Sequence, residues 1–132
     1  MLDLARECKR NEILLHVSTA YVNAHQPEFK PISEKLYPFR EDWEQYLKEI
    51  EEMSPQNAEE NIDQLLGEFH NTYMLTKHMA ELHIEKYRGN VSVAINRPSM
   101  VCPSYKEPFP GWVDSVAAAG TVIFPTAMGW SR

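Results

Sequence analysis

The sequence predicts an α/β fold with parallel strands. Two short apolar segments, residues 13–17 and residues 91–95, have the length and the flanking residues of buried strands. The longest helical pattern, residues 70–88, lies between them and ends at Gly89, the residue type that most often closes a helix. A helix between two such strands is typical of a crossover that brings the second strand back parallel to the first.

Shorter helices are expected on both sides of the first strand. Apolar residues at helical spacing occur in residues 1–8, and three prolines punctuate the loop after the strand. Residues 42–53 predict an amphipathic helix, whose large apolar side chains are Trp43, Tyr46, Leu47 and Ile50. Pro55 is expected to end this helix, and residues 58–66 predict a second, short helix that ends at Gly67.

Composition excludes several classes of protein. The hydrophobic fraction of 43% and the charged fraction of 24% are those of an ordinary soluble domain, and the net charge of −6 does not suit a nucleic-acid surface. Cys8 and Cys102 form no CxxC pair, which favours reduced thiols. The most apolar stretch, residues 113–128, contains Asp114 and Pro125, so we expect a loop, short strand or helix there and not a membrane anchor.

Tyr73 and Lys77 form the first candidate for chemistry. Their i, i+4 spacing places both side chains on one face of the predicted helix. A phenol has a reference pKa of about 10, and a nearby ammonium stabilises its ionised form. Such a tyrosine can donate a proton to a carbonyl oxygen while hydride reaches the carbon, and the lysine can also hydrogen-bond a ribose. The spacing alone is a weak signal, because it also arises by chance in a chain with six tyrosines.

Two more candidate segments follow the predicted strands. Ser18 and Thr19 lie at the carboxyl end of the first strand, where open α/β sheets bind ligands, and a hydroxyl there can contact the same carbonyl oxygen. A turn that ends the strand is the alternative interpretation of these two residues. Residues 97–101 follow the second strand in the same way, and a proline that simply stops the strand is their alternative interpretation.

A metal site is not expected. His78 and His83 are five residues apart, which on a helix turns their side chains roughly 140° away from each other. His16 lies inside a predicted strand, where a packed, hydrogen-bonded histidine is the simpler interpretation. No GxSxG elbow, Walker loop or GxGxxG turn occurs in the 132 residues, so the usual phosphate cradle of a dinucleotide is absent from them.

Together these segments resemble the fatty acyl-CoA reductases, which are extended short-chain dehydrogenase/reductases with a male-sterility-type NAD-binding domain. Five segments carry the resemblance: HVSTAYVN at 16–23, EKLYP at 34–38, NTYMLTK at 71–77, RPSMV at 97–101 and YKEPFPGW at 105–112. The last of these is the most specific. The chain is thereby identified as an internal fragment of such an enzyme.

The resemblance implies a more specific fold class. We expect a partial Rossmann-type, doubly wound parallel sheet that lacks the N-terminal glycine-rich βαβ unit. Residues 1–123 would form the central and C-terminal part of this reductase domain, and residues 124–132 would form a divergent tail. Without the glycine-rich unit, these residues would hold a dinucleotide poorly and would be a poor catalyst alone.

The resemblance also implies a reaction and a role for each candidate residue. NADPH would reduce a long-chain fatty acyl-CoA to a primary alcohol in two hydride transfers. Tyr73 would protonate the alkoxide, and Lys77 would hold the nicotinamide ribose, so both would also contact the cofactor. Thr19, or alternatively Ser18, would orient the carbonyl. The segment after the second strand would line the nicotinamide by main-chain contacts, at Pro98, Ser99 and Val101.

The implied partners are NADPH and a long-chain fatty acyl-CoA, without nucleic acid or metal. Membrane contact would occur only through parts absent from this chain, which would itself be soluble, and the full-length protein would work at the cytosolic face of the peroxisome or endoplasmic reticulum. Two alternatives stay open. One is another extended reductase or epimerase that acts on a sugar nucleotide or a sterol, and the other is a truncated product without catalytic activity.

Overall fold

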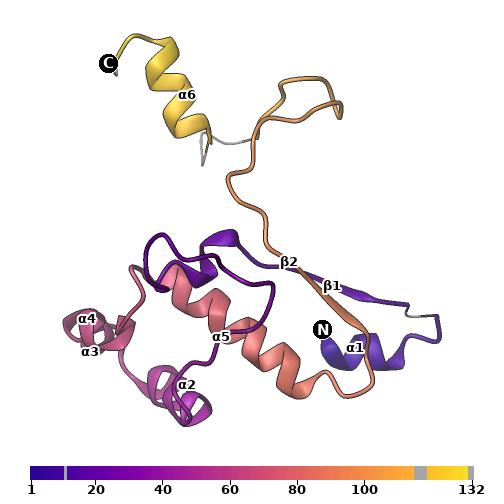
Figure 1. The fold of residues 1–132 in the computed structure, drawn as a ribbon, viewed down its shortest axis with the longest axis vertical. Coiled ribbons are helices and arrows are strands. Elements are labelled where there is room, and N and C mark those ends of the chain that lie inside the picture. Colours follow the sequence, from indigo (N-terminus) through magenta and orange to yellow (C-terminus); the bar gives the residue numbers. More distant parts are fainter. Residues whose placement is uncertain (11, 115–118, 131–132) are drawn as a thin grey trace. The chain divides into compact units, whose positions relative to one another are not determined.

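The computed structural model describes residues 1–10, 12–114 and 119–130 and divides into two compact units, Met1–Arg97 and Pro98–Arg132. The first unit contains, in order, α1 (Leu2–Glu7), β1 (Leu14–Val17), the 3-10 helix η1 (Ala20–Asn23), α2 (Trp43–Glu52), α3 (Pro55–Glu60), α4 (Ile62–Leu66), α5 (Thr72–Tyr87) and β2 (Val93–Asn96) (Figure 1). The second unit contains a loop rich in aromatic residues and α6 (Ala119–Ala127). Over the described ranges, no helix has both the length and the apolar character needed to cross a bilayer.

The two strands pair in parallel, which confirms the predicted α/β fold with parallel strands. Their register runs from Leu14 opposite Val93 to Val17 opposite Asn96. Helices α2 to α5 lie between the strands in the sequence, as a parallel connection requires. The larger doubly wound sheet stays a prediction.

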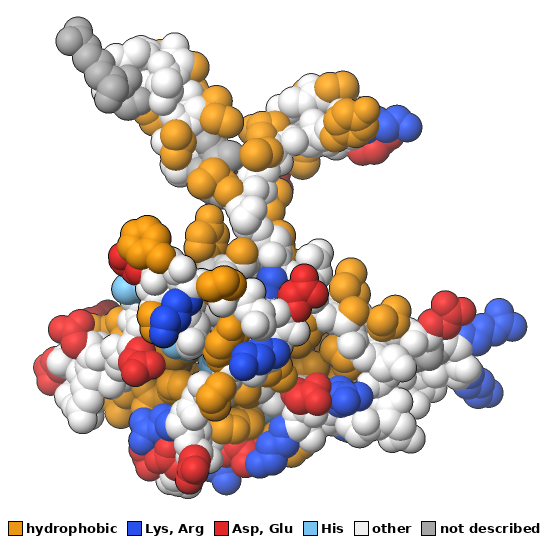
Figure 2. Space-filling view, viewed as in Figure 1, with side chains coloured by type: hydrophobic (Ala, Val, Ile, Leu, Met, Phe, Trp, Pro, Cys, Tyr) orange, Lys and Arg blue, Asp and Glu red, His pale blue; other side chains and the backbone are white. Residues whose placement is uncertain are grey.

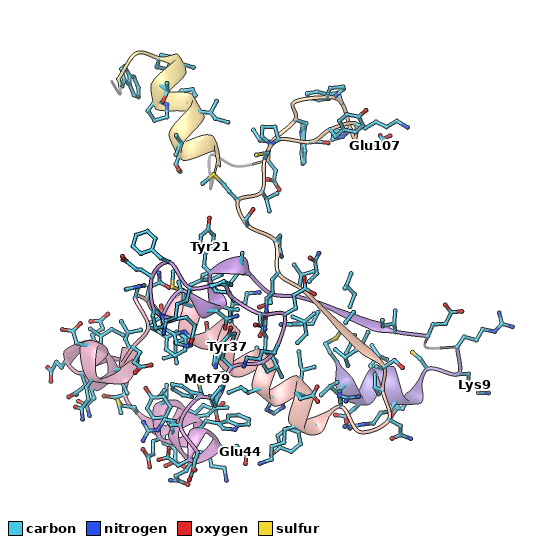
Figure 3. All side chains as sticks on the ribbon, viewed as in Figure 1. Lys9, Tyr21, Tyr37, Glu44, Met79 and Glu107 are labelled. Carbon is cyan, nitrogen blue, oxygen red and sulfur yellow. The ribbon has the colours of Figure 1, made fainter. Side chains whose placement is uncertain are left out.

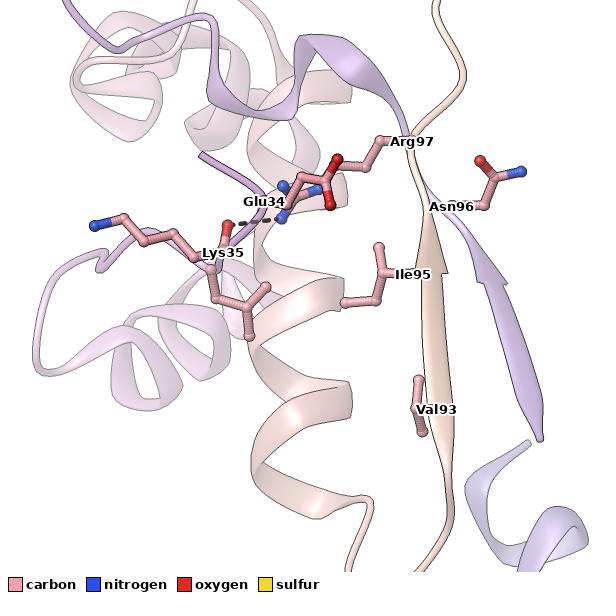
Figure 4. A pocket seen from close by; sticks show the side chains of 7 residues that line it. Glu34, Lys35, Val93, Ile95, Asn96 and Arg97 are labelled. Atoms are coloured by element: carbon pink, nitrogen blue, oxygen red, sulfur yellow. Dashed lines mark hydrogen bonds between the residues drawn. The ribbon is translucent and has the colours of Figure 1, made fainter. Parts of the chain in front are cut away.

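One face of this small sheet packs on α5, and the described residues of the first unit leave the other face uncovered. The register puts His16 and Ile95 on the same face, and Ile95 points from β2 toward α5 (Figure 4). On the opposite face, Leu15 and Val17 are 57% and 53% exposed. The expectation of a buried first strand was therefore wrong for one of its faces, because α5 covers only the other.

Asn71 and Gly89 mark the ends of α5. The Asn71 side-chain oxygen accepts a hydrogen bond from the backbone N–H of Met74 at 2.9 Å, which satisfies a donor of the first turn. Gly89 follows the helix with a φ of +57°, a left-handed conformation that glycine adopts without strain. The helix predicted over residues 70–88 is confirmed.

Apolar side chains of α5 and of the segments around it form the core of the first unit. Four buried side chains form its centre: Tyr46, Phe69, Leu75 and Met79. Further along the same helix, Lys86 and Tyr87 both donate hydrogen bonds to the carboxylate of Glu44. Figure 3 shows Glu44 on α2. Helix α5 is therefore held against α2 by an apolar contact and by a polar one.

Helix α2 ends at Glu52, before Pro55 as predicted, and Pro55 then begins the next helix. The Ser54 hydroxyl accepts a hydrogen bond from the N–H of Asn57 at 3.3 Å, and Pro55 takes the first helical position of α3. Proline fits there because the first turn needs no N–H from it. The one helix expected over residues 58–66 is therefore the end of α3 followed by α4, which ends at Gly67 as predicted.

The second unit holds the most specific of the sequence segments. Residues 104–112 form a loop that two backbone hydrogen bonds close, from Ser104 N to Trp112 O at 2.9 Å and from Gly111 N to Ser104 O at 2.8 Å. The apolar stretch at 113–128 contains α6, and its residues 115–118 lie outside the described ranges. The tail boundary expected between residues 123 and 124 falls within α6 and stays a prediction.

Acidic and basic side chains are interspersed over the face of the first unit that Figure 2 shows. Several form exposed ion pairs, such as that of Arg40 with Asp42 at 2.6 Å. Exposed pairs of this kind contribute about 0–1 kcal/mol each, whereas burying one large apolar side chain contributes about 1.5–3 kcal/mol. The apolar core therefore outweighs the surface charges in stabilising this unit.

Replacing Asn71 by alanine is expected to lower the free energy of unfolding by about 1 kcal/mol, because the Met74 N–H loses its partner. Urea unfolding followed by circular dichroism measures this loss. The matched control is Asn90→Ala, an exposed asparagine just beyond the other end of α5, which should change stability by less than about 0.5 kcal/mol. Equal losses in the two variants would contradict the capping role.

Candidate active site

The carboxyl ends of β1 and β2 meet at one edge of the sheet. The backbone N–H of Ser18 donates to the carbonyl of Asn96 at 2.7 Å, which brings the residues that follow the two strands together. Ser18 and Thr19 are each only 3% exposed. This edge is where a parallel sheet binds ligands.

The two adjacent hydroxyls differ in their hydrogen bonds. Thr19 accepts a hydrogen bond from the N–H of Tyr21 at 3.2 Å and caps η1, so the turn interpretation describes part of its role. The hydroxyl oxygen of Ser18 is buried without a hydrogen-bond partner among the described residues. Both hydroxyl hydrogens are thus available for donation to another oxygen.

Helix α5 carries Tyr73 and Lys77 to this edge. The Lys77 ammonium donates a hydrogen bond to the carbonyl of Val17 at 3.1 Å, directly before Ser18. The same ammonium lies 6.0 Å from the centre of the Tyr73 ring, and Tyr73 is 51% exposed. The Lys77 ammonium therefore lies near both the end of β1 and the Tyr73 ring, and half of the Tyr73 side chain is accessible to solvent.

The other proposed cofactor residues lie in the second unit. Pro98 follows Arg97 directly in the chain, and Ser99 and Val101 are exposed within their own unit. Their contact with a nicotinamide stays a prediction.

A buried ion pair between Glu81 and Arg97 is part of this edge, and the sequence did not predict it. The Arg97 Nε and one terminal nitrogen donate to the two carboxylate oxygens of Glu81 at 2.9 and 2.6 Å. Glu81 is 1% exposed, and its hydrogen bonds raise the pKa of Arg97 above its ordinary value. The spacing of Tyr73, Lys77 and Glu81, each four residues from the next, was the signal that could have indicated it.

Arg97 also contacts the loop that precedes α2. A terminal nitrogen of Arg97 donates to the carbonyl oxygen of Lys35 at 3.2 Å (Figure 4). This loop and β2 line a pocket of about 570 Å³, whose residues are Glu34, Lys35, Leu36, Val93, Ile95, Asn96 and Arg97. The EKLYP segment, which the sequence singled out by resemblance alone, therefore lies next to the end of β2.

Histidines and aromatic rings from α5 and the segments beside it form a cluster that sequence reasoning missed. His78 is 1% exposed, and its ring lies 5.4 Å from that of His25 and 5.2 Å from that of Phe69. Neither nitrogen of His78 has a hydrogen-bond partner among the described residues. Burial lowers the pKa of His78, and the neighbouring His25 lowers it further, while Glu81 acts in the opposite direction.

The expectation for His16 was wrong in part. Its side chain is half-buried on β1, but its Nε2 is buried without a hydrogen-bond partner in the described part of the chain. The pKa of His16 is lowered by burial and then by the charge of Lys77. Among the residues that the structure describes, no three or more His, Cys, Asp and Glu side chains gather in a way that would hold a metal ion.

Comparison with known proteins identifies the family. The model of a NAD-binding domain, described as male sterility protein, matches residues 1–131. The chain belongs to the male sterility protein family. This confirms the relationship that the sequence motifs indicated, and it covers the strands, α5 and the loop at residues 104–112 alike.

Curated relatives of this family member are named as fatty acyl-CoA reductases. Fatty acyl-CoA reductase 1 of Xenopus laevis is 38% identical over 132 residues, which is 100% of this chain and 25% of the relative. Fatty acyl-CoA reductase 2 of Mus musculus is 33% identical over 132 residues, which is again 100% of this chain and 25% of the relative. Fatty acyl-CoA reductase 1 of Homo sapiens is 38% identical over 129 residues, which is 98% of this chain and 24% of the relative. The chain thus spans about a quarter of the length of these relatives. No solved structure matches the chain at a significant level.

The stability of the family member is expected to fall as the pH is lowered from 7.5 to 5.5. Burial holds the pKa of His78 below its ordinary 6.5, so the unfolded chain takes up a proton first and the folded state loses stability. Each such histidine contributes a slope of at most about 1.4 kcal/mol per pH unit. Urea unfolding at the two pH values measures the change.

His78→Phe should reduce this pH dependence, because it removes the buried titrating group. His83→Phe, which replaces an exposed histidine on the same helix, is the control for exchanging an imidazole for a phenyl ring. The interpretation would be wrong if both variants kept the pH dependence of the unsubstituted protein.

Proposed function

We propose that this family member is a fatty acyl-CoA reductase, which uses NADPH to convert a long-chain acyl-CoA to a primary alcohol. The placement of Lys77 carries the proposal, since its ammonium lies 3.1 Å from the Val17 carbonyl and 6.0 Å from the centre of the Tyr73 ring. The family's NAD-binding domain and the names of the relatives support the cofactor class and the substrate class.

The proposal includes a fold and a domain assignment. The two parallel strands would belong to a Rossmann-type, doubly wound sheet, of which residues 1–123 form the central and C-terminal part and residues 124–132 a divergent tail. The sequence holds no glycine-rich turn for the cofactor's phosphates, so these 132 residues alone are proposed to be a poor catalyst. We place the reaction at the cytosolic face of the peroxisome or endoplasmic reticulum, with membrane contact outside the described residues.

The side chains at the end of β1 fit a nicotinamide ribose and a substrate carbonyl. An ammonium has three N–H donors, and Lys77 uses one of them on the Val17 carbonyl, which leaves two for ribose hydroxyls. Ser18 offers a buried hydroxyl without a partner, and Thr19 keeps its hydroxyl hydrogen available. Pro98, Ser99 and Val101 are proposed to line the nicotinamide, on the basis of their place directly after β2 in the chain.

The proposed reaction needs two reductions at one carbon, and NADPH supplies a hydride for each. In the first, the hydroxyl of Thr19, or of Ser18, would hydrogen-bond the thioester oxygen as negative charge develops there. The C–S bond then breaks to give an aldehyde and the thiolate of coenzyme A, which takes a proton from solvent. In the second, Tyr73 donates its phenolic proton to the oxygen as the alkoxide forms. The positive charge of Lys77 stabilises the phenolate that remains, and the exposed Tyr73 regains a proton from solvent.

An assay of the full-length protein with palmitoyl-CoA tests the substrate class. We expect hexadecanol as the product, with two NADPH consumed for each alcohol formed, and little turnover when NADH replaces NADPH. A sugar nucleotide and a sterol serve as the comparison substrates. Turnover of either of these, with no alcohol from palmitoyl-CoA, would assign the chain to another kind of extended reductase.

Tyr73→Phe in the full-length protein should lower kcat by about 10²–10⁴-fold, because the proton donor is lost, while the Kd for NADPH changes little. Lys77→Ala should lower kcat and also weaken NADPH binding, since the ribose loses its partner. Tyr87→Phe is the matched control: it removes a phenol from the same helix, where the hydroxyl bonds Glu44, and should leave turnover unchanged. Near-normal turnover of Tyr73→Phe would show that Tyr73 is not the acid.

A further inference from the structure

We propose that Glu81 and Arg97 are positioning residues, which hold Tyr73 and Lys77 at the carboxyl ends of the two strands. The inference rests on the proposed function, because Tyr73 and Lys77 are the groups that it holds in place. Neither Glu81 nor Arg97 is assigned contact with substrate or cofactor.

Tyr73, Lys77 and Glu81 follow each other at four-residue intervals, and at 100° per residue each is turned only about 40° from the one before. All three therefore share one side of the helix. Lys77 joins this side of α5 to the end of β1 by a hydrogen bond to the Val17 carbonyl. Glu81 joins it to the end of β2 by its ion pair with Arg97.

Lys77 and Arg97 differ in how firmly they hold α5 to the strands. Lys77 bonds through one ammonium on a flexible four-carbon stem, and its proposed role requires it to reach a ribose as well. The guanidinium of Arg97 meets both oxygens of Glu81, at 2.9 and 2.6 Å, in the two-point geometry that fixes direction as well as distance. Because the carbonyl of Lys35 occupies a further donor of Arg97, the guanidinium is held by α5 and by the loop before α2 together. The Glu81–Arg97 ion pair is therefore the rigid contact between α5 and the strands, and the hydrogen bond of Lys77 is the flexible one.

The ion pair of Glu81 and Arg97 is largely buried. Glu81 is 1% exposed and the Arg97 side chain 19%, so both groups have lost most of their hydration. A buried ion pair is a weak source of stability, since an apolar pair of similar volume often replaces it without loss. Stability alone therefore does not explain the pair, whereas control over the position of the Tyr73 and Lys77 side of α5 does. A misplacement of about 1 Å at a reacting group can lower a rate by about 10²-fold.

The test separates positioning from stability in the full-length protein. The double variant Glu81→Leu/Arg97→Met replaces the pair by apolar side chains and should remain folded. We expect its kcat per NADPH-binding site, with the sites counted by titration, to fall by about 10–100-fold. We expect the KM for palmitoyl-CoA to change less than threefold. A purely structural role would lower the number of binding sites and leave the kcat of each site unchanged.

Arg97→Lys is the second variant, and it tests the positioning role if the double variant does not fold. It keeps the positive charge but loses the two-point contact, so its kcat per site should fall by about tenfold. The matched control is Glu44→Gln/Lys86→Met, which removes the exposed ion pair that joins α5 to α2 and should keep kcat within twofold. Normal kcat per site in Arg97→Lys, or in a folded double variant, overturns the inference while leaving the proposed function intact. If the unsubstituted protein does not reduce acyl-CoA, both the proposed function and this inference are wrong.

Discussion

The packing of Leu75 and Met79 on Tyr46 and Phe69 is the contact on which the rest of the first unit depends. It fixes the rotation of α5 about its own axis, because these two side chains occupy one side of the helix. The opposite side carries Tyr73, Lys77 and Glu81 toward the strand ends. Burial of large apolar side chains, at about 1.5–3 kcal/mol each, is the largest stabilising contribution in this region, so the apolar core sets the position of the polar groups.

Local patterns in the sequence predicted the helices and strands. They did not predict contacts between residues that are far apart in the chain. The strands and α5 were predicted correctly, because apolar spacing and Gly89 act over a few residues. The pairing of Glu81 with Arg97 joins residues sixteen positions apart and depends on how β2 lies against α5. The segment at 13–17 is apolar at nearly every position, which predicted burial of both faces, whereas the described residues cover only one.

The same distinction applies to the candidate site. The sequence predicted Tyr73 and Lys77 on one face of a helix, and the structure adds the contact of Lys77 with the end of β1. The roles of Ser18 and Thr19 followed from resemblance, since a strand-ending turn explains the same residues. Nothing in the local pattern indicated that Asn23 and His78 would be buried without hydrogen-bond partners in the described structure.

These unpartnered groups oppose the apolar core. Leaving such a group unsatisfied costs about 1–3 kcal/mol, and Ser18, Asn23 and His78 have polar side-chain atoms without a hydrogen-bond partner among the described residues. Buried groups of this kind concentrate at functional sites, where a ligand or a water molecule can complete their hydrogen bonds. They lie in the segment just after β1 and on α5, the two elements that carry the candidate catalytic residues.

The uncovered face of the sheet has a consequence for handling the molecule. Leu15 and Val17 present apolar side chains to solvent, and each strand pairs along only one edge within the described residues. Flat apolar faces and open strand edges promote association between copies of a chain. A preparation of these residues by themselves is therefore expected to associate at high concentration.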